Sequence, residues 1–341
     1  MFLNILIFIG GILILYVGAE GMVRGAKRIA LSLGIHPLIV GLTIVAFGTS
    51  TPELVVSMTA ALKGSPAIAL GNAIGSNVAN LGLILGISAL LAPMRVEDRT
   101  VRLEVPISIF AGIFLFIFAG NLEISSGEGI VLLIGFAITF FVAVFPQIVK
   151  SLKVLPEEFN LELQNPVTQE EINEARSSQS WFGDILMVIL GIGGLVLGAD
   201  FTVRSATVIA LEFGISEMVI GASVVALGTS LPELATSVVA AIKNEPDISV
   251  GNVIGSNLFN TMIVIGLPAS ITGYLPVEKD VLIYDFPVMI GLSILVLPLL
   301  CSDRKLDRAE GMGLILVYLA YLALIIIRPQ MILNVETLWP Y

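Results

Sequence analysis

The sequence predicts an all-α polytopic membrane protein of ten transmembrane helices, arranged as two inverted five-helix repeats with broken helices at the midplane. The first reason is composition: 56% of the 341 residues are hydrophobic and 13% are charged, which is far from a soluble domain. The second is a repeat, because residues 41–80 recur at 221–260 with 22 identities in 40 positions. The third is that each copy places one carboxylate, Glu53 or Glu233, in an apolar stretch.

Ten apolar runs have about the 17 to 25 residues that cross a hydrocarbon core. They lie at roughly 2–19, 36–61, 66–92, 103–120, 128–149, 182–202, 216–241, 246–271, 281–301 and 309–327. The first repeat therefore covers 1–149 and the second 182–341. The first run has no basic leader and no cleavage signature, and residues 11–40 match 191–220 at 13 of 30 positions. We therefore expect the first span to remain in the mature protein.

The odd number of spans in each half predicts an inverted repeat, because the second copy must start from the opposite side of the membrane. Lysine and arginine test this. The loops after spans 1, 3, 5, 7 and 9 hold 13 basic residues and the other side holds 4. By the positive-inside rule, the richer side is cytoplasmic and both termini lie outside.

Residues 150–181 form the one substantial polar segment, and they are rich in glutamate. We interpret them as a cytoplasmic linker between the repeats. The alternative, a calcium-sensing acidic patch, lacks the DxDxDG pattern of a calcium-binding hand. The net charge of −10, with basic residues scattered among short loops, excludes a nucleic-acid footprint. The single cysteine, Cys301, excludes an internal disulfide, and we expect it to be a small buried side chain.

The candidate site begins with residues 48–53, GTSTPE, and their copy at 228–233, GTSLPE. Proline removes a backbone donor and clashes with the preceding turn, so each helix should break here and free carbonyls. Broken backbone at membrane depth is tolerated where it lines a cavity. Carbonyl, hydroxyl and carboxylate oxygens are the ligands that hard cations such as Ca²⁺ and Na⁺ take.

A second motif follows in each half, GNAIGSNVAN at 71–80 and GNVIGSNLFN at 251–260. Asn72, Ser76 and Asn80 share one helix face, so a row of amide and hydroxyl oxygens should face the carboxylate. Gly71 and Gly75 favour close helix approach.

Each of these residues has a plainer interpretation. Asn72 and Asn252 fit interhelical hydrogen bonding as well as ion binding. An internal ion pair would explain Glu53 and Glu233, but no basic residue lies inside the spans. Glu20 and Asp200 fit an interfacial role as well as a functional one, and His36 is more typical of a span boundary than of a ligand.

On these two repeated motifs the chain resembles the cation/calcium antiporters, and within them the prokaryotic, minimal form of the sodium/calcium exchanger branch. The resemblance implies a four-site diamond in which Glu53 and Glu233 hold Ca²⁺. The implied partners in the Ca²⁺ and Na⁺ sites are Thr49, Ser50, Ser76, Thr229, Ser230, Ser256 and the carbonyls of Ala46 and Ala226. Asn80 and Asn260 belong to the same set, and they depart from the family, which often has Asn in one repeat and Asp in the other. The resemblance also implies that spans 1 and 6 slide across a rigid bundle.

The predicted function is secondary antiport of Na⁺ against Ca²⁺ by alternating access, electrogenic, in a prokaryotic cell membrane. The two ions are substrates, the bilayer is the surroundings, and neither a cofactor nor an enzymatic activity is expected. A proton/calcium or other divalent-cation antiporter is the closest alternative. A cation channel could use the same oxygens, but the inverted repeat favours a carrier, and the two buried carboxylates disfavour a scaffold.

Overall fold

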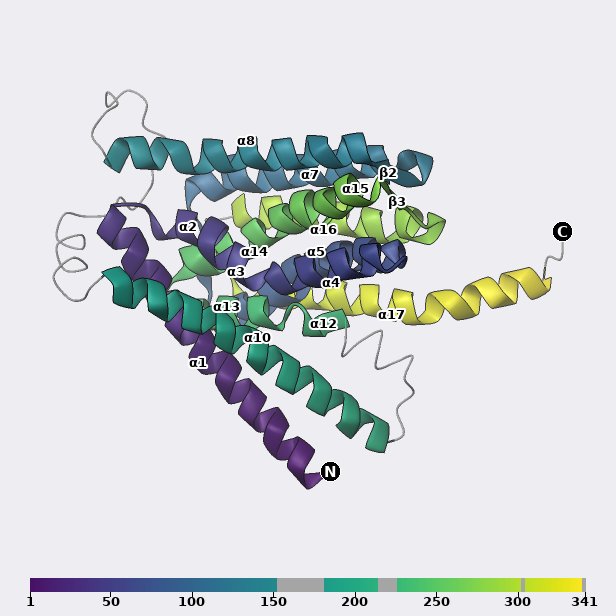
Figure 1. Ribbon diagram of the computed structural model, residues 1–341, viewed down its shortest axis with the longest axis horizontal. Helices are drawn as coiled ribbons and strands as arrows, with labels where there is room; N and C mark the ends of the chain where they lie inside the picture. Colours follow the sequence, from purple (N-terminus) through teal and green to yellow (C-terminus); the bar gives the residue numbers. More distant parts are fainter. Residues whose placement is uncertain (152–180, 214–225, 302–303, 339–341) are drawn as a thin grey trace.

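The computed structural model describes residues 1–151, 181–213, 226–301 and 304–338, and gives side-chain surroundings for most of them. The predicted linker and residues 216–225, where the seventh span was expected to begin, lie almost wholly outside these ranges. Figure 1 shows a bundle of long helices, with α1 and α10 crossing its flank side by side.

The first half is built from helices joined by short turns. In order they are α1 (Phe2–Leu33), α2 (Pro37–Val40), the π-helix η1 (Gly41–Val45), α3 (Ala46–Thr49), α4 (Thr51–Leu62), α5 (Pro66–Ala79), η2 (Asn80–Ile84), α6 (Leu85–Leu91), η3 (Thr100–Glu104), α7 (Val105–Phe118), the 3₁₀ turn η4 (Ala119–Asn121) and α8 (Ser126–Ser151), with strands β1 (Met94–Arg95) and β2 (Glu123–Ser125) in the connections.

The second half repeats this order. It contains α10 (Trp181–Glu212), α12 (Ala226–Gly228), α13 (Leu231–Ile242), α14 (Pro246–Phe259), η7 (Asn260–Val264), α15 (Gly266–Thr272), η8 (Val281–Asp285), α16 (Phe286–Cys301) and α17 (Arg308–Leu338), with strands β3 (Tyr274–Pro276) and β4 (Lys305–Leu306). Helices α13 and α14 begin 180 residues after α4 and α5, which is the offset of the sequence repeat.

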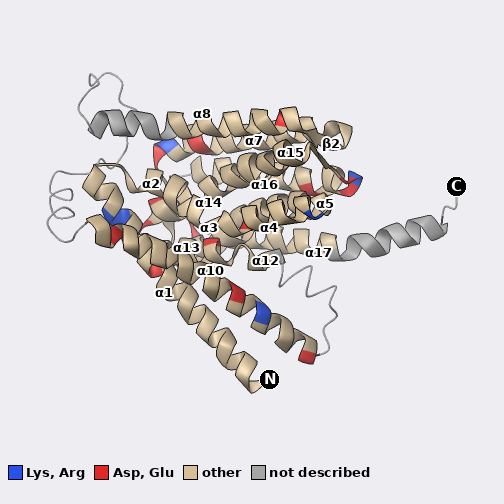
Figure 2. Cartoon of the chain, in the orientation of Figure 1, with Lys and Arg blue, Asp and Glu red and all other residues tan. Residues whose placement is uncertain are grey.

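Within the described ranges, seven helices are long and apolar enough to cross a membrane. An eighth is counted if the bent pair Pro37–Thr49 and Thr51–Leu62 forms one span, and two shorter apolar helices cover Ser126–Val142 and Leu231–Ile242. The protein is therefore a helical, multi-pass membrane protein. Figure 2 shows acidic and basic residues mainly towards the helix ends, with long stretches of the bundle free of charge.

Three expectations need correction. The first helix does not end at residue 19 but continues to Leu33, and Gly34 in a left-handed conformation is its C-cap. Its copy α10 likewise continues beyond residue 202, to Glu212. Cys301 is exposed rather than buried, since it ends α16. The helical class also has two short ribbons, in which β1 pairs antiparallel with β4 and β2 with β3.

Helices α1 and α10 pack through glycines at seven-residue spacing. A Cβ on Gly18 would lie 2.8 Å from the backbone nitrogen of Leu195, and one on Gly198 would lie 2.7 Å from that of Leu15. Gly11 and Gly191 are equally tight. The two backbones therefore approach closely at this line of glycines, the glycine strip.

Close helix approach was predicted at Gly71 and Gly75, and the structure shows it at their copies, Gly251 and Gly255. A Cβ on Gly251 or Gly255 would come within 2.8 Å of a backbone oxygen of the segment 38–42. A Cβ on Gly71 or Gly75 would meet no described atom of another segment within 4 Å. The segment of the second half that is equivalent to 38–42, residues 218–222, lies outside the described residues.

Candidate ion-binding site

Each helix that carries a carboxylate is interrupted just before it. Helix α3 ends at Thr49 and α4 starts at Thr51, with Pro52 in its first turn, and the two axes differ by 44°. The joint is Ser50 at φ −85°, ψ 5°, and Ser230 has nearly the same backbone angles before α13. The proline prediction of a broken helix is confirmed at both positions. Glu53 and Glu233 lie in the first turns of the new helices, where the helix dipole favours an anion.

The two carboxylates are held by serines from the opposite repeat. The hydroxyl of Ser50 donates to Oε1 of Glu233 at 2.8 Å, and that of Ser230 to Oε1 of Glu53 at 3.4 Å. The Ser230 oxygen also lies 3.1 Å from Oγ of Ser76. Both glutamates are at most 1% exposed. The sequence repeat thus folds into a reciprocal pair of contacts between the two halves of the chain.

Several buried oxygens of the predicted ligand set have no hydrogen-bond partner among the described residues: Glu53 Oε2, Glu233 Oε2, Asn80 Oδ1, Asn260 Oδ1 and Ser256 Oγ. Unpaired carboxylate oxygens at this depth are costly. Among the described residues neither glutamate forms an ion pair, so the internal ion-pair alternative gains no support. An oxygen-rich, negatively charged and buried cradle is what a hard cation requires.

The side chains of Asn72 and Asn252 form hydrogen bonds to neighbouring helices within the protein. The Asn72 amide donates to the Glu53 carbonyl at 3.3 Å and to Ser57 Oγ at 3.0 Å, and Asn252 makes the same two bonds to Glu233 and Ser237. Their carbonyl oxygens accept from the other repeat, since Thr49 donates to Asn252 at 3.1 Å and Thr229 to Asn72 at 3.3 Å. The interhelical hydrogen-bond interpretation therefore accounts for both.

A second polar layer lies where α5 and α14 change into π-helices. The turns η2 and η7 start at Asn80 and Asn260, and π turns often occur at functional sites. The Asn80 amide donates to Asn257 at 2.9 Å, and the Asn77 amide donates to Thr261 at 2.8 Å. Asn77 and Asn257 stand in the repeated motif but were not among the predicted site residues. Their repetition at an offset of 180 was the available signal.

The structure describes the surroundings of one of the two predicted carbonyl ligands, that of Ala46. The Ala46 carbonyl accepts the Ser50 amide at 2.9 Å and lies 3.3 Å from the Thr49 hydroxyl. It is therefore not freed by the break, although a carbonyl oxygen can accept further bonds. Ala226 opens α12, and its surroundings lie outside the described part of the chain.

Two charged residues of uncertain role belong to surface ion pairs. Glu20 contacts Lys243 at 2.8 Å, and Asp200 contacts Arg204 at 2.7 Å. In these ion pairs both side chains contact basic residues, which supports the interfacial interpretation. His36 is the N-cap of α2 and accepts the Leu38 amide on Nδ1 at 3.3 Å, so its prediction as a boundary residue is confirmed.

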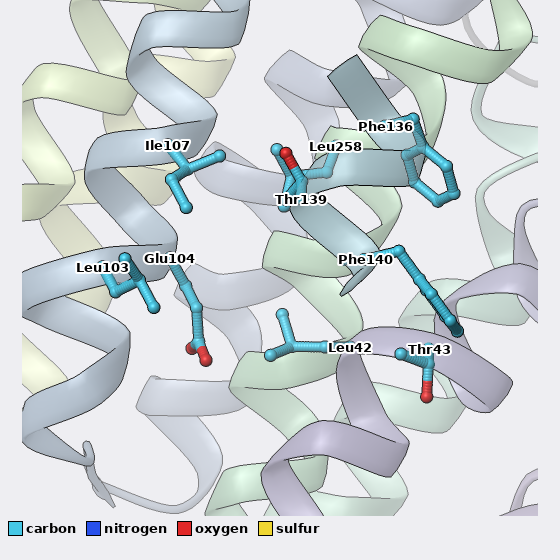
Figure 3. A pocket seen from close by; sticks show the side chains of 10 residues that line it. Leu42, Thr43, Leu103, Glu104, Ile107, Phe136, Thr139, Phe140 and Leu258 are labelled. Carbon is cyan, nitrogen blue, oxygen red and sulfur yellow. The ribbon is translucent and has the colours of Figure 1, made fainter. Parts of the chain in front are cut away.

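A separate pocket opens between α8 and the helices beside it (Figure 3). It is mainly apolar, with the Glu104 carboxyl at one side, and is lined by Leu42, Thr43, Leu103, Glu104, Ile107, Phe136, Thr139, Phe140, Gly255 and Leu258. None of the predicted ion ligands lines it. Glu104 is paired with Arg99 at 3.1 Å, so this pocket does not have the paired carboxylates of the ion site.

The two copies of the motif, each with a buried carboxylate, can be compared with the sequences of known families. A family model described as "Sodium/calcium exchanger protein" matches residues 3–145 and 184–327. The chain belongs to the sodium/calcium exchanger family. The predicted resemblance to this branch of the cation/calcium antiporters is therefore confirmed. Members of this family are transporters rather than enzymes, and Na⁺ and Ca²⁺ are their substrates.

Named relatives cover nearly the whole chain. Inner membrane protein YrbG of Escherichia coli is 37% identical over 95% of this chain and 97% of its own length. The sodium/calcium exchanger MaX1 of Methanosarcina acetivorans is 33% identical over 94% and 98%. A solved structure of the sodium-calcium exchanger NCX_Mj superimposes with a TM-score of 0.76, at 30% identity, over 94% of this chain and 98% of that one.

A more distant relative, the Ca(2+)/H(+) antiporter ChaA of Bacillus subtilis, is 24% identical over 88% of this chain and 86% of its own length. The chain is thus an antiporter of the cation/calcium class. The counter-ion differs among the named relatives.

Proposed function

We propose that this chain exchanges Na⁺ for Ca²⁺ by alternating access at the buried carboxylate pair. The proposed ligands are the Glu53 and Glu233 carboxylates with the oxygens of Thr49, Ser50, Ser76, Asn80, Ala46, Thr229, Ser230, Ser256, Asn260 and Ala226. The observation that carries the proposal is the pair itself: each glutamate has one oxygen held by a serine of the other repeat and one buried oxygen without a donor among the described residues.

Exchange follows from differential binding at this pair. One Ca²⁺ or several Na⁺ neutralise the two carboxylates, and the two loads exclude each other. The empty site keeps two uncompensated negative charges, which are expensive to move through a low-dielectric interior. The loaded forms therefore interconvert between inward and outward states faster than the empty form, and transport in one direction requires transport in the other.

Na⁺ rather than H⁺ is the counter-ion that the relatives favour. MaX1 and NCX_Mj are both named as sodium/calcium exchangers and match nearly the full chain at 33% and 30% identity. The Ca²⁺/H⁺ alternative rests on ChaA at 24% identity.

We infer an architecture of ten spans in two inverted repeats, with both termini outside a prokaryotic cell membrane. Two observations support it. The inferred topology puts the 93–102 and 302–308 loops on one side and the 121–127 and 272–280 loops on the other, and the ribbons join them in these pairs. Ion pairs agree, because Lys27 meets Glu245 on the side called cytoplasmic, and the amino group of Met1 meets Glu212 on the other.

The moving part is inferred to be α1 with α10. They touch each other along the glycine strip and carry large exposed apolar side chains on their outer faces. The close contact at these glycines keeps the two helices packed as one unit, while the flank of this unit slides over the bundle that holds the carboxylates. Sliding of packed helices is the shear type of domain movement.

The test is ⁴⁵Ca²⁺ uptake into proteoliposomes loaded with Na⁺, K⁺ or choline, each with and without a pH gradient. The proposal expects uptake driven by internal Na⁺, and little with K⁺ or choline at equal pH. Uptake driven by internal protons without Na⁺ would assign the Ca²⁺/H⁺ alternative. Uptake that needs no counter-ion would indicate a channel.

A further inference from the structure

A second cluster of ligating side chains lies away from the carboxylate pair, where α2 and α14 begin. His36 caps α2, Asp247 stands in the first turn of α14, and Glu97 precedes η3. One ligand atom from each side chain can be chosen so that all three lie within 4.8 Å of one another. The His36 Nε2 to Asp247 Oδ2 distance is 3.9 Å.

This cluster is mostly buried and holds two carboxylates. His36 and Glu97 are each 3% exposed, and the Asp247 side chain is 24% exposed. Asp247 is repelled by Glu97, Glu104 and Glu245 together. Of these neighbours, Glu245 pairs with Lys27 and Glu104 pairs with Arg99.

Glu104 adds a further buried carboxylate beside the cluster. Its side chain is 3% exposed, and its Oε2 accepts no hydrogen bond from the part of the chain that the structure describes. It repels both Glu97 and Asp247. Carboxylates gathered in a buried place are stabilised when they coordinate a metal.

We propose that His36, Glu97 and Asp247 bind a divalent transition metal of the Zn²⁺ class. An imidazole with two carboxylates is a set that Zn²⁺ accepts, whereas Ca²⁺ takes oxygen ligands. The cluster therefore selects against the transported ion. Ligands of a tetrahedral Zn²⁺ at about 2.1 Å stand about 3.4 Å apart, so metal entry requires the ligand atoms, which now lie within 4.8 Å of one another, to close by up to about 1.4 Å.

Metal binding would also change the cap of α2. At present Nδ1 of His36 accepts the Leu38 amide, so a proton on this ring sits on Nε2. A metal on Nε2 requires the proton on Nδ1, which then cannot accept from Leu38. Helix α2 continues through η1 and α3 to Thr49 and Ser50. Occupancy of this cluster is thereby linked to the helix that carries ion ligands. The inference goes beyond Na⁺/Ca²⁺ exchange and does not depend on it.

The inverted repeat supplies a matched control. Val96-Glu97 corresponds to Val277-Glu278 in the second half, but the positions equivalent to the other two ligands hold Ala67 and Ser216. Glu278 is exposed. The same carboxylate thus occurs once with its partners and once without them.

The test is isothermal titration of Zn²⁺ into the purified full-length protein, with saturating Ca²⁺ present to occupy the transport site. The parent is expected to bind one Zn²⁺ at the cluster. His36→Gln and Asp247→Asn should each weaken this binding at least about tenfold, and Glu278→Gln should leave it unchanged. Co²⁺ in place of Zn²⁺ should give visible absorption bands that are lost in the same two variants.

The proposal is overturned if the parent binds no Zn²⁺, or if His36→Gln and Asp247→Asn bind it as tightly as the parent. Circular dichroism and gel filtration report whether each variant is folded. Asp247 is partly exposed, so Asp247→Asn keeps the comparison valid even where His36→Gln fails to fold. Because no gradient or flux is measured, failure here is distinct from failure of the exchange proposal.

Discussion

Glu53 and Glu233 each accept a hydrogen bond from a serine of the opposite repeat, so neither half of the chain forms the candidate site alone. Ser50 reaches Glu233 and Ser230 reaches Glu53. The remaining oxygen of each glutamate is buried without a donor in the described structure. The two glutamates therefore have the same kind of partner, but the serine hydrogen bond is shorter at Glu233, 2.8 Å, than at Glu53, 3.4 Å.

The first prediction concerns this pair. Glu53→Gln and Glu233→Gln each remove one negative charge from the proposed Ca²⁺ site, and Ca²⁺ flux should fall by more than about 100-fold, since the loss of even outer partners of a metal ligand costs 10–100-fold. The measurement is Na⁺-driven ⁴⁵Ca²⁺ uptake in proteoliposomes. Glu123→Gln, at an exposed position, is the control. Near-parental flux in either site variant would show that the pair is not the site.

The second prediction concerns Asn252, which bonds to Glu233, Ser237 and Thr49. Asn252→Ala removes all three bonds and leaves buried partners unsatisfied. Interhelical bonds in membrane proteins contribute about 0.6 kcal/mol each and up to about 1.7, so unfolding free energy should drop by about 2–4 kcal/mol. Thermal aggregation in detergent, followed by size-exclusion chromatography, reports the lower stability as a lower midpoint temperature. An unchanged melting profile would contradict the bracing role.

At the scale of elements, the glycine strip between α1 and α10 controls how closely two long helices approach. Gly11 and Gly191 are repeat equivalents, as are Gly18 and Gly198, and each packs against the backbone of the other helix. A methyl group on any of them would meet backbone atoms that cannot rotate away. The strip is thus sensitive to the smallest change of side chain.

The third prediction is that Gly198→Ala slows exchange. Its Cβ would lie 2.7 Å from the Leu15 nitrogen, so the two helices must separate and their flank must repack. Gly193→Ala on the same helix is the control, because no described atom lies within 4 Å of its Cβ. That control should be neutral or more stable by about 0.5–1 kcal/mol. Equal transport rates in the two variants would mean that helix contact does not limit exchange.

At the scale of the whole molecule, the two repeats are tied together at both ends of the bundle. The ribbon β1–β4 and the ribbon β2–β3 each pair one strand from each half, and α14 packs against η1 and α3 of the first half. Each half contributes one carboxylate, so the charge that the proposed transport cycle moves depends on both halves.

The fourth prediction is electrogenicity. With two carboxylates, Ca²⁺ leaves the site neutral and three Na⁺ leave it with one positive charge, so net charge crosses in each cycle. A potential that is negative inside should then favour Na⁺ entry and Ca²⁺ exit, as each elementary charge gains about 2.3 kcal/mol per 100 mV. Valinomycin with a K⁺ gradient imposes the potential on the proteoliposomes. Rates that ignore the potential would indicate two Na⁺ per Ca²⁺.

The sequence by itself determined the membrane class, the repeat and the paired carboxylates. Apolar runs, an offset of 180 and a proline beside each glutamate are local signals, and a proline favours the first turn of a helix over its interior. The break at Ser50 and the first-turn position of Glu53 therefore agree with expectation. The extension of α1 to Leu33 was missed, because helical hydrogen bonding continues past the point where the apolar run ends.

Only the tertiary structure decided which oxygens face each other. The crossing of Ser50 to Glu233, the bracing by Asn72 and Asn252, and the π turns at Asn80 and Asn260 depend on how four helices from two halves meet. The convergence of His36 with Glu97 and Asp247 does too. These residues are far apart along the chain, and contacts at such separation are fixed by packing, which periodicity and local propensity do not encode.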